Sequence, residues 1–243
     1  EFKKHFMQEY PARPKSFSHM ISMNTKGAPL LDRRTEDRPL TPSQFREAME
    51  RGAKVIDTRD APAYGGVHIP GSINIGFGSQ MANWIGMAVE PESDILLVFT
   101  EDEKYRDMCA LLFRIGYDNI LGYLQGGVPG WQEHGYPIER LSQMSVQELQ
   151  EEITRNTDLR IIDVRSESEW NKGHIEAAEL LPLPEMVLKD VDLPKGENII
   201  VTCRVGYRGN IGASYLQMQG FTKVHNLAGG MQAWTNAGFP LPV

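Results

Sequence analysis

The chain has little cysteine, no long apolar run and no excess of positive charge, and each shortage narrows its class. Two cysteines among 243 residues cannot form a disulfide framework, so we expect a reducing, cytoplasmic location. No stretch approaches the length of a membrane span and no signal peptide is visible, so we expect no membrane partner. The net charge of −7 argues against a nucleic-acid partner.

Histidine is also sparse, and its placement argues against a metal site. The six histidines are scattered without the spacing of metal ligands, so we expect no metal and no other cofactor. The hydrophobic content of 41% and the charged content of 23% are those of an ordinary globular protein of one large or two average domains. Residue 1 is Glu rather than Met, as expected for a fragment or a processed piece.

The chain contains an internal sequence repeat with two copies. Residues 55–59 (VIDTR) resemble residues 161–165 (IIDVR), and His68 and His174 follow them at one interval, since 163 − 57 and 174 − 68 are both 106. Further matches occur in the same order, namely Gly116-Tyr117 with Gly220-Phe221 and Gly126-Gly127 with Gly229-Gly230. Because so many matches keep one order, we infer a duplicated domain of about 100 residues.

Each repeat opens with a helix start signal, since residues 41–44 (TPSQ) and 145–148 (SVQE) fit a capping box. Short apolar strands are expected at 55–57, 95–99, 119–121, 161–164, 198–202 and 223–226. Helices are expected between them at 44–51, 105–115, 146–155 and 209–219. This alternation predicts an α/β fold in which each repeat is a mostly parallel sheet flanked by helices on both faces.

The repeats divide the chain into three segments. The first repeat spans residues 39–140, the second spans 141–243, and residues 137–145 form the short link between them. Residues 1–38 are rich in proline and charge and have little periodicity. We interpret them as an extended arm or as the tail of a missing preceding domain.

The second repeat carries the strongest chemical signal, because an apolar run stops at Cys203 and a glycine and two arginines follow. This order places a thiol at the floor of a short loop between a buried strand and a helix N-terminus. Loop N–H groups, the helix dipole and the charges of Arg204 and Arg208 all favour a thiolate there. Cys109 lies in an apolar helical run without a basic neighbour and is expected to be a core residue.

With residues 163–165 (DVR) and 173–175 (GHI) upstream of this loop, the chain resembles the rhodanese (sulfurtransferase) family over residues 39–243. The resemblance implies two tandem rhodanese-like α/β domains, with Cys203 carrying a sulfane sulfur as a persulfide. It implies a small anionic sulfur donor and a thiol acceptor as partners. The donor would be bound by the loop residues Arg204, Val205, Gly206, Tyr207 and Arg208, and three further positions look structural, namely Asp163, Arg165 and His174.

The first repeat departs from this pattern. Matching the residues after its second strand with the loop places Glu101 opposite Cys203, followed by two more acidic residues, Asp102 and Glu103. A carboxylate cannot carry a persulfide, and acidic groups repel an anion. We therefore predict that this repeat is catalytically silent and shapes one wall of the site.

A weaker resemblance lies in the arm. Residues 10–17 (YPARPKSF) look like the tail of the metallo-β-lactamase-like domain in persulfide dioxygenase–rhodanese fusions. This resemblance implies a preceding domain of that kind as a partner within a longer parent protein.

Two other functions share parts of the pattern. Cysteine phosphatases of this fold also end an anion-binding loop in arginine, but they need five residues between cysteine and arginine. Here there are four, from Arg204 to Tyr207, and the tighter loop suits a single sulfur atom. A docking or redox-sensing module is the second alternative, and a Cys203 that oxidises without transferring sulfur would favour it.

Overall fold

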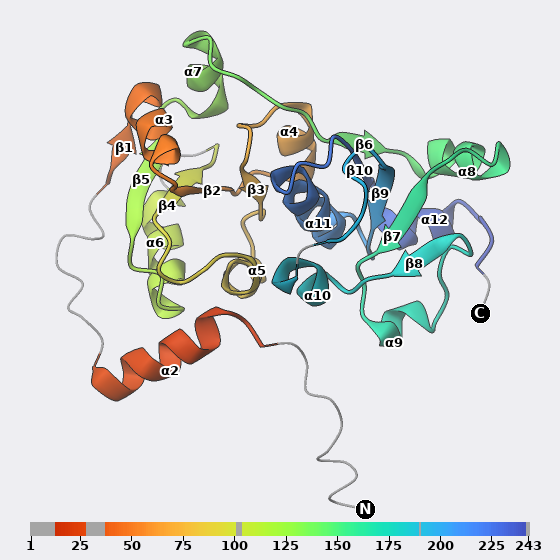
Figure 1. Cartoon of the computed structure of the whole chain (residues 1–243), viewed down its shortest axis with the longest axis horizontal. Coiled ribbons are helices and arrows are strands. Elements are labelled where there is room, and N and C mark those ends of the chain that lie inside the picture. Colours follow the sequence, from red (N-terminus) through yellow and green to blue (C-terminus); the bar gives the residue numbers. More distant parts are fainter. Residues whose placement is uncertain (1–12, 28–36, 101–103, 190, 242–243) are drawn as a thin grey trace, which may run out of the picture.

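In the computed structural model, which describes residues 13–27, 37–100, 104–189 and 191–241, two five-stranded sheets follow one another along the chain (Figure 1). The first sheet has the order β1-β5-β4-β2-β3, built from Pro39–Leu40 (β1), Lys54–Asp57 (β2), Ile73–Asn74 (β3), Ile95–Val98 (β4) and Ile120–Leu124 (β5). The second has the order β6-β10-β9-β7-β8, built from Ser142–Met144 (β6), Arg160–Asp163 (β7), Ala178–Leu180 (β8), Asn198–Thr202 (β9) and Lys223–Leu227 (β10). All pairings between these strands are parallel.

Helices cover both faces of each sheet. The first domain contains Pro42–Glu50 (α3), Ala61–Gly66 (α4), Met81–Ala88 (α5), Tyr105–Arg114 (α6) and Gly127–Glu133 (α7). The second contains Val146–Thr154 (α8), Glu167–Trp170 (α9), Leu183–Leu188 (α10), Tyr207–Met218 (α11) and Gly230–Asn236 (α12). One core lies between each sheet and its outer helices, α3 with α7 and α8 with α12, and a third core lies on the inner faces. The predicted fold class is therefore confirmed.

Local sequence signals account for most of these elements. Both predicted capping boxes are present, with Thr41 and Ser145 each accepting a hydrogen bond from the N–H group three residues later. All six predicted strands occur within a few residues of their expected bounds. The short strands β1, β3, β6 and β8 were not predicted, and β6 occupies part of the segment expected to be a link.

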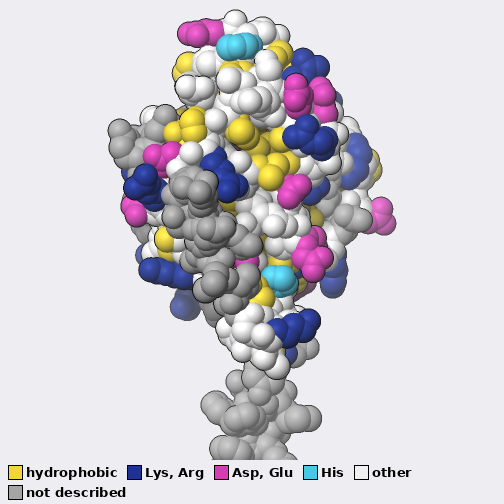
Figure 2. All heavy atoms as spheres, turned by 90° about the vertical axis from the view of Figure 1, so that its left-hand side faces the viewer, with side chains coloured by type: hydrophobic (Ala, Val, Ile, Leu, Met, Phe, Trp, Pro, Cys, Tyr) yellow, Lys and Arg dark blue, Asp and Glu magenta, His cyan; other side chains and the backbone are white. Residues whose placement is uncertain are grey.

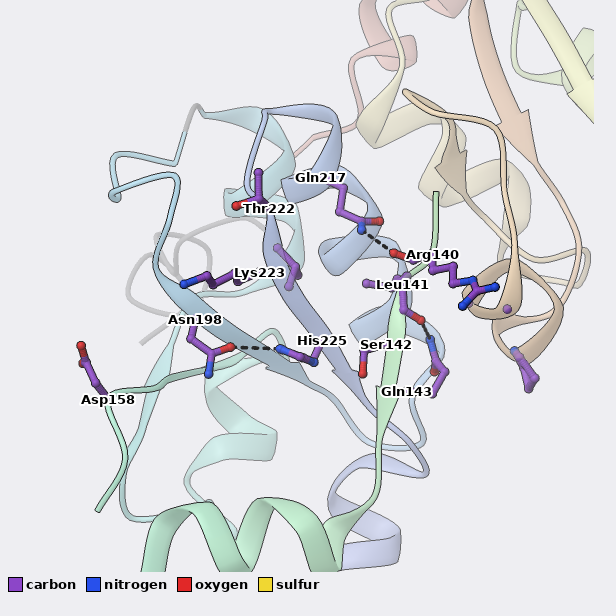
Figure 3. Close-up of a pocket in the computed structure, with 14 residues that line it drawn as sticks. Arg140, Leu141, Ser142, Gln143, Asp158, Asn198, Gln217, Thr222, Lys223 and His225 are labelled. Carbon is purple, nitrogen blue, oxygen red and sulfur yellow. Dashed lines mark hydrogen bonds between the residues drawn. The ribbon is translucent and has the colours of Figure 1, made fainter. Parts of the chain in front are cut away.

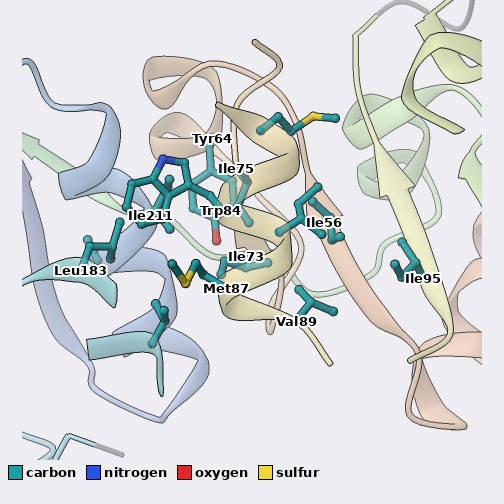
Figure 4. Packing of buried hydrophobic residues seen from close by; sticks show 14 of the residues in the cluster. Ile56, Tyr64, Ile73, Ile75, Trp84, Met87, Val89, Ile95, Leu183 and Ile211 are labelled. Carbon is teal, nitrogen blue, oxygen red and sulfur yellow. The ribbon is translucent and has the colours of Figure 1, made fainter. Parts of the chain in front are cut away.

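The two domains share the inner core. Trp84 and Met87 of α5 belong to one buried cluster with Leu183 of α10 and Ile211 of α11 (Figure 4). Helix α11 is buried along almost its whole length between β9 and the first domain, and it packs on β3. Because α11 begins directly after the Cys203 loop, the first domain supports the helix that carries this loop.

Residues before β1 are only partly described, and they differ from the extended arm that the sequence predicted. Residues Ser16–Lys26 form helix α2, which packs near α5, with Ser16 against Gly86 and His19 against Gly116. Residues 10–12 of the motif likened to a metallo-β-lactamase-like tail lie outside the described residues.

On the outer face of the first domain, acidic, basic and hydrophobic side chains are interspersed (Figure 2). Within the described ranges, no helix has both the length and the apolar character needed to cross a membrane.

Candidate active site

Cys203 lies directly after β9, at the carboxyl edge of the second sheet, with 1% of its surface exposed. The N–H group of Gly206 donates a hydrogen bond to its Sγ at 3.2 Å. Gly206 has a φ of +93°, and a Cβ there would come within 3.3 Å of the Gly229 nitrogen. Glycine is therefore needed for this N–H group to face the sulfur.

The loop is also held from behind by the first turn of α12. The N–H groups of Met231 and Gln232 donate to the carbonyl oxygens of Cys203 and Arg204, at 2.8 and 2.9 Å. Gly230 has a φ of +53°, and a Cβ at this position would collide with the Cys203 carbonyl oxygen. The Gly-Gly pair of this repeat thus serves a tight turn, and that turn fixes the backbone of the cysteine.

Arg208 does not project freely toward the sulfur. Its guanidinium donates two hydrogen bonds to Glu169, at 2.7 Å each, and Ser166 caps the same helix, α9. The bonds from Arg208 are the main reason why the pKa of Glu169 falls to about 2. The same pairing raises the pKa of Arg208, and the nearby Cys203 and Asp163 act in the same direction. Arg208 therefore lies within the electrostatic reach of the thiol with its orientation fixed.

The other loop side chains lie at the surface or line a cleft between the domains. Arg204 is exposed, and 55% of the Val205 surface is accessible. Val205, Gly206 and Tyr207 line a cleft of about 780 Å³ between the domains, and neither arginine lines it. The Tyr207 hydroxyl donates to the Gly76 carbonyl of the first domain at 3.0 Å. The sequence predicted that Arg204 and Arg208 would both bind the donor. In the structure, Arg208 is already paired with Glu169.

Asp163, Arg165 and His174 are brought together beside the loop. Arg165 donates to both carboxylate oxygens of Asp163 and to the Gly173 carbonyl, and both charged side chains are at least nine-tenths buried. His174 stacks on Trp170, with ring centroids 3.7 Å apart, and its Nδ1 lies 3.2 Å from the Trp170 carbonyl oxygen. These contacts join the end of β7 to the turn that follows α9.

The first domain repeats the same arrangement. Arg59 binds Asp57 and the Val67 carbonyl oxygen, and His68 stacks on Tyr64 at 3.8 Å. Burial lowers the pKa of His68 to about 4, so this ring is neutral near pH 7. Because this domain keeps the arrangement without a cysteine at its loop, the contacts do not depend on a thiol.

The residue that matches Cys203 in the first domain is Phe99, and the expectation of Glu101 is wrong. Strand pairing aligns Asp57 with Val98 in one sheet and Asp163 with Thr202 in the other, so Phe99 and Cys203 are the next residues. From these strand ends to the glycine that follows each helix the distance is 18 residues, since 116 − 98 equals 220 − 202. The two loops therefore do not differ in length. Residues 101–103 lie outside the described residues.

Aromatic rings fill the space around Phe99. Tyr105 and Tyr123 lie with their ring centroids 6.4 and 5.0 Å from that of Phe99 and 4.9 Å from each other. By the same register, the second domain has Gly209 and Asn226 at these two positions. The second domain thus has a small and a polar residue at the two positions where the first domain has tyrosines.

Sequence reasoning missed Glu169 and Asn226. The Ser166-x-x-Glu169 capping box had the same form as the two that were recognised, so a signal for Glu169 was present. Asn226 had no such signal, because its position depends on the register of β10. Cys109 is fully buried and burial raises its pKa, as expected for a core thiol. Across the part of the chain that the structure describes, no three His, Cys, Asp or Glu side chains are grouped to hold a metal ion.

A second hollow, of about 1060 Å³, lies at the opposite ends of the strands (Figure 3). Asn198 and Lys223, the first residues of β9 and β10, line it, and so does His225, whose Nε2 lies 3.0 Å from Asn198 Oδ1. Cys203 follows the other end of β9, so this hollow is separate from the thiol.

Comparison with known proteins assigns the family. The family model of the rhodanese-like domain matches residues 41–134 and 145–237. The chain therefore belongs to the rhodanese-like domain family, with two such domains in tandem.

Two curated relatives match a length of about one domain each, and one solved structure matches most of the chain. A sulfurtransferase from Allochromatium vinosum is 29% identical over 101 residues, which are 42% of this chain and 94% of the relative. The thiosulfate sulfurtransferase GlpE from Stutzerimonas stutzeri is 36% identical over 84 residues, covering 33% of this chain and 73% of the relative. The crystal structure of a Pseudomonas aeruginosa thiosulfate sulfurtransferase matches 84% of this chain and 43% of its own, with 22% identity and a TM-score of 0.39.

Proposed function

We propose that this chain is a sulfurtransferase that carries sulfane sulfur as a persulfide on Cys203. The donor is thiosulfate or a low-molecular-weight persulfide, and the acceptor is a thiol, or cyanide in an assay. The bond from the Gly206 N–H group to Sγ is the observation that carries the proposal. The family membership and the names of the relatives support the same reaction class.

The reaction consists of two displacements. The Cys203 thiolate attacks the outer sulfur of thiosulfate, a new S–S bond forms, and the old S–S bond breaks as its electron pair leaves with sulfite. An acceptor thiolate then attacks the outer sulfur of the enzyme persulfide. The acceptor leaves as a persulfide, and the bonding electron pair returns to Cys203. No net oxidation occurs, and ping-pong kinetics follow from the covalent intermediate.

The surroundings of Cys203 suit this chemistry. The Gly206 N–H group already points at the sulfur, and the N-terminus of α11 adds positive potential. Glu169 holds the Arg208 guanidinium, so the positive charge of Arg208 stays in place when negative charge develops on the sulfur. In this proposal Asp163, Arg165 and His174 hold the neighbouring turn and take no part in proton transfer, because the first domain has the same contacts.

The first domain has a supporting role in this proposal. Phe99 cannot carry sulfur, and the aromatic rings around it leave no equivalent of the Gly209 and Asn226 positions. Its side chains Phe77 and Lys104 line the same cleft as Val205 and Tyr207, so a molecule bound in this cleft would contact both domains. A preceding metallo-β-lactamase-like domain, a cytoplasmic location and a role in sulfide or persulfide metabolism stay predictions.

The test compares Cys203→Ser with the matched control Cys109→Ser. After incubation with thiosulfate or glutathione persulfide, the wild type and the control should gain one sulfur that cyanide removes, and Cys203→Ser should gain none. Loss of sulfur loading in the control, or loading in Cys203→Ser, would contradict the assignment. A wild-type thiol that oxidises but never gains sulfur would favour the redox-sensing alternative, and hydrolysis of an aryl phosphate would favour the phosphatase.

A further inference from the structure

A chain of buried and half-buried amide side chains joins the first domain to the Cys203 loop. Asn74, at the end of β3, accepts a hydrogen bond from Asn210 of α11 at 2.6 Å. Asn210 accepts from Gln143 of β6 at 2.8 Å, and Gln143 accepts from Asn226 of β10 at 2.8 Å. We call these four residues the amide relay.

The relay has one polarity, and backbone carbonyl oxygens near both Asn74 and Gln143 set it. The Asn74 Nδ2 donates to the backbone carbonyl oxygens of Asp57 and Arg59, at 3.0 and 2.9 Å. These two groups can only accept, so the Asn74 oxygen must face Asn210. Each following amide then donates toward Asn74 and accepts from the next. Gln143 Nε2 also donates to the Leu141 carbonyl oxygen at 3.3 Å, which holds the Gln143 amide in the same direction. The relay therefore ends with the oxygen of Asn226 pointing away from Gln143.

The end of the relay lies against the Cys203 loop. Asn226 is 1% exposed, and its Nδ2 is 3.7 Å from the place where a Gly206 Cβ would be. Its Oδ1 lies so close to Gly209, in the first turn of α11, that a Cβ there would collide with it. Among the described residues this oxygen has no hydrogen-bond partner. An oxygen suits the unpaired N–H groups and positive potential of a helix N-terminus, whereas an amide NH2 group does not.

We propose that the amide relay makes Asn74 of the first domain a positioning residue for Cys203. Asn74 fixes the direction in which the Asn226 amide faces, together with the Leu141 carbonyl oxygen that also holds Gln143. Asn226 in turn lies next to Gly206, whose N–H group contacts the sulfur. This role rests on the proposed function only for its effect on sulfur transfer. Its effect on the reactivity of the Cys203 thiol stands independently.

The first domain's own loop has no counterpart of the relay. Tyr123 and Pro39 stand at the positions that match Asn226 and Gln143 by strand register. The relay residues next to the loop thus occur in the domain that has the cysteine and not in the other domain of the same fold. This contrast separates it from the buried Asp-Arg pairs, which both domains share.

The experiment measures alkylation of Cys203 by iodoacetamide across pH, together with the rate of sulfur loading from thiosulfate, in the full chain. Asn74→Ala and Gln143→Ala should each shift the alkylation profile to higher pH and slow loading by roughly three- to tenfold, as expected for weakening one charge-assisted hydrogen bond. Because both changes break one relay, the double variant should be no slower than either single one. Ser214→Ala is the matched control, because Ser214 accepts from the Asn74 backbone N–H group at 3.0 Å across the same interface without joining the relay. It should lower the unfolding midpoint and leave the alkylation profile in place.

An unmoved alkylation profile in Asn74→Ala, or effects that multiply in the double variant, would overturn the relay. If Asn74→Ala does not fold, Gln143→Ala against Ser214→Ala carries the test. Shifted alkylation profiles without sulfur loading in any variant, the wild type included, would keep the relay and reject the sulfurtransferase. Sulfur loading by the wild type, together with alkylation profiles that do not move in the variants, would keep the sulfurtransferase and reject the relay.

Discussion

Phe99 occupies in the first domain the position that Cys203 occupies in the second, directly after the strand that pairs with the Asp-x-Arg strand. The two residues share backbone surroundings, including a Gly-Gly turn behind the loop. They differ in what surrounds the side chain, which is aromatic at Phe99 and small or polar at Cys203. The two domains therefore differ at this place in several side chains and not in one residue.

A cysteine placed at position 99 should not make the first domain accept sulfur. In the double variant Phe99→Cys/Cys203→Ser, Tyr105 and Tyr123 still occupy the places of Gly209 and Asn226, and no equivalent of the Gly206 contact is expected. Intact mass after incubation with thiosulfate should show no added sulfur. A persulfide on residue 99 would show that a thiol after this strand is sufficient.

The Glu169–Arg208 pair should control the rate of sulfur loading. Glu169→Gln removes the charge that holds the Arg208 fork, so we expect loading to slow by roughly tenfold, the size of one charge-assisted contact in the transition state. The measurement is single-turnover loading from thiosulfate. Glu167→Gln, on an exposed position of the same helix, is the control and should load at the wild-type rate. Equal rates for the two variants would remove Glu169 from the account.

The same pair gives a defined pH dependence of stability. The folded pKa of Glu169 is about 2, below its ordinary value of 4.5. Its contribution to stability is therefore complete above about pH 4.5 and is lost as the pH falls through about 2. The difference in unfolding free energy between the wild type and Glu169→Gln should be constant from pH 8 to 5 and shrink below that. Urea titrations at several pH values measure it, and a difference that instead changes between pH 8 and 5 would contradict the assignment.

The buried Asp-Arg pairs should stabilise the two domains alike. Arg59→Ala and Arg165→Ala each leave a buried carboxylate without its partner, which costs about 3–5 kcal/mol. Denaturant unfolding measures this cost, and Arg46→Ala, which removes an exposed pair with Glu50, should have no measurable effect. A large effect for Arg165 alone would mean that the pair serves the active site rather than the fold.

The sequence predicts the fold well where signals are local. Apolar strands such as residues 198–202 and capping boxes such as the one at Ser145 depend on neighbouring residues, and the structure confirms them. The edge strand β6 has the sequence Ser-Gln-Met, which lacks an apolar pattern, so only pairing with β10 makes it a strand. Helix α2 was missed for a related reason, since its stability comes from packing near α5.

In the candidate site, too, local motifs could be predicted from the sequence and long-range contacts could not. Cys203 and Gly206 follow from a six-residue motif, and the structure places them together. Matching Glu101 to Cys203 failed because an acidic run after a strand resembles a degenerate loop, and only strand register identifies Phe99. Asn74 could not be found from sequence, because its partner lies 136 positions away in the other domain.

The central claim is that Cys203 carries sulfur, and the most direct measurement is the intact mass of the chain after incubation with thiosulfate. The account predicts one added sulfur in the wild type, lost on addition of cyanide and absent in Cys203→Ser. A wild-type mass that stays unchanged with both thiosulfate and glutathione persulfide would contradict it.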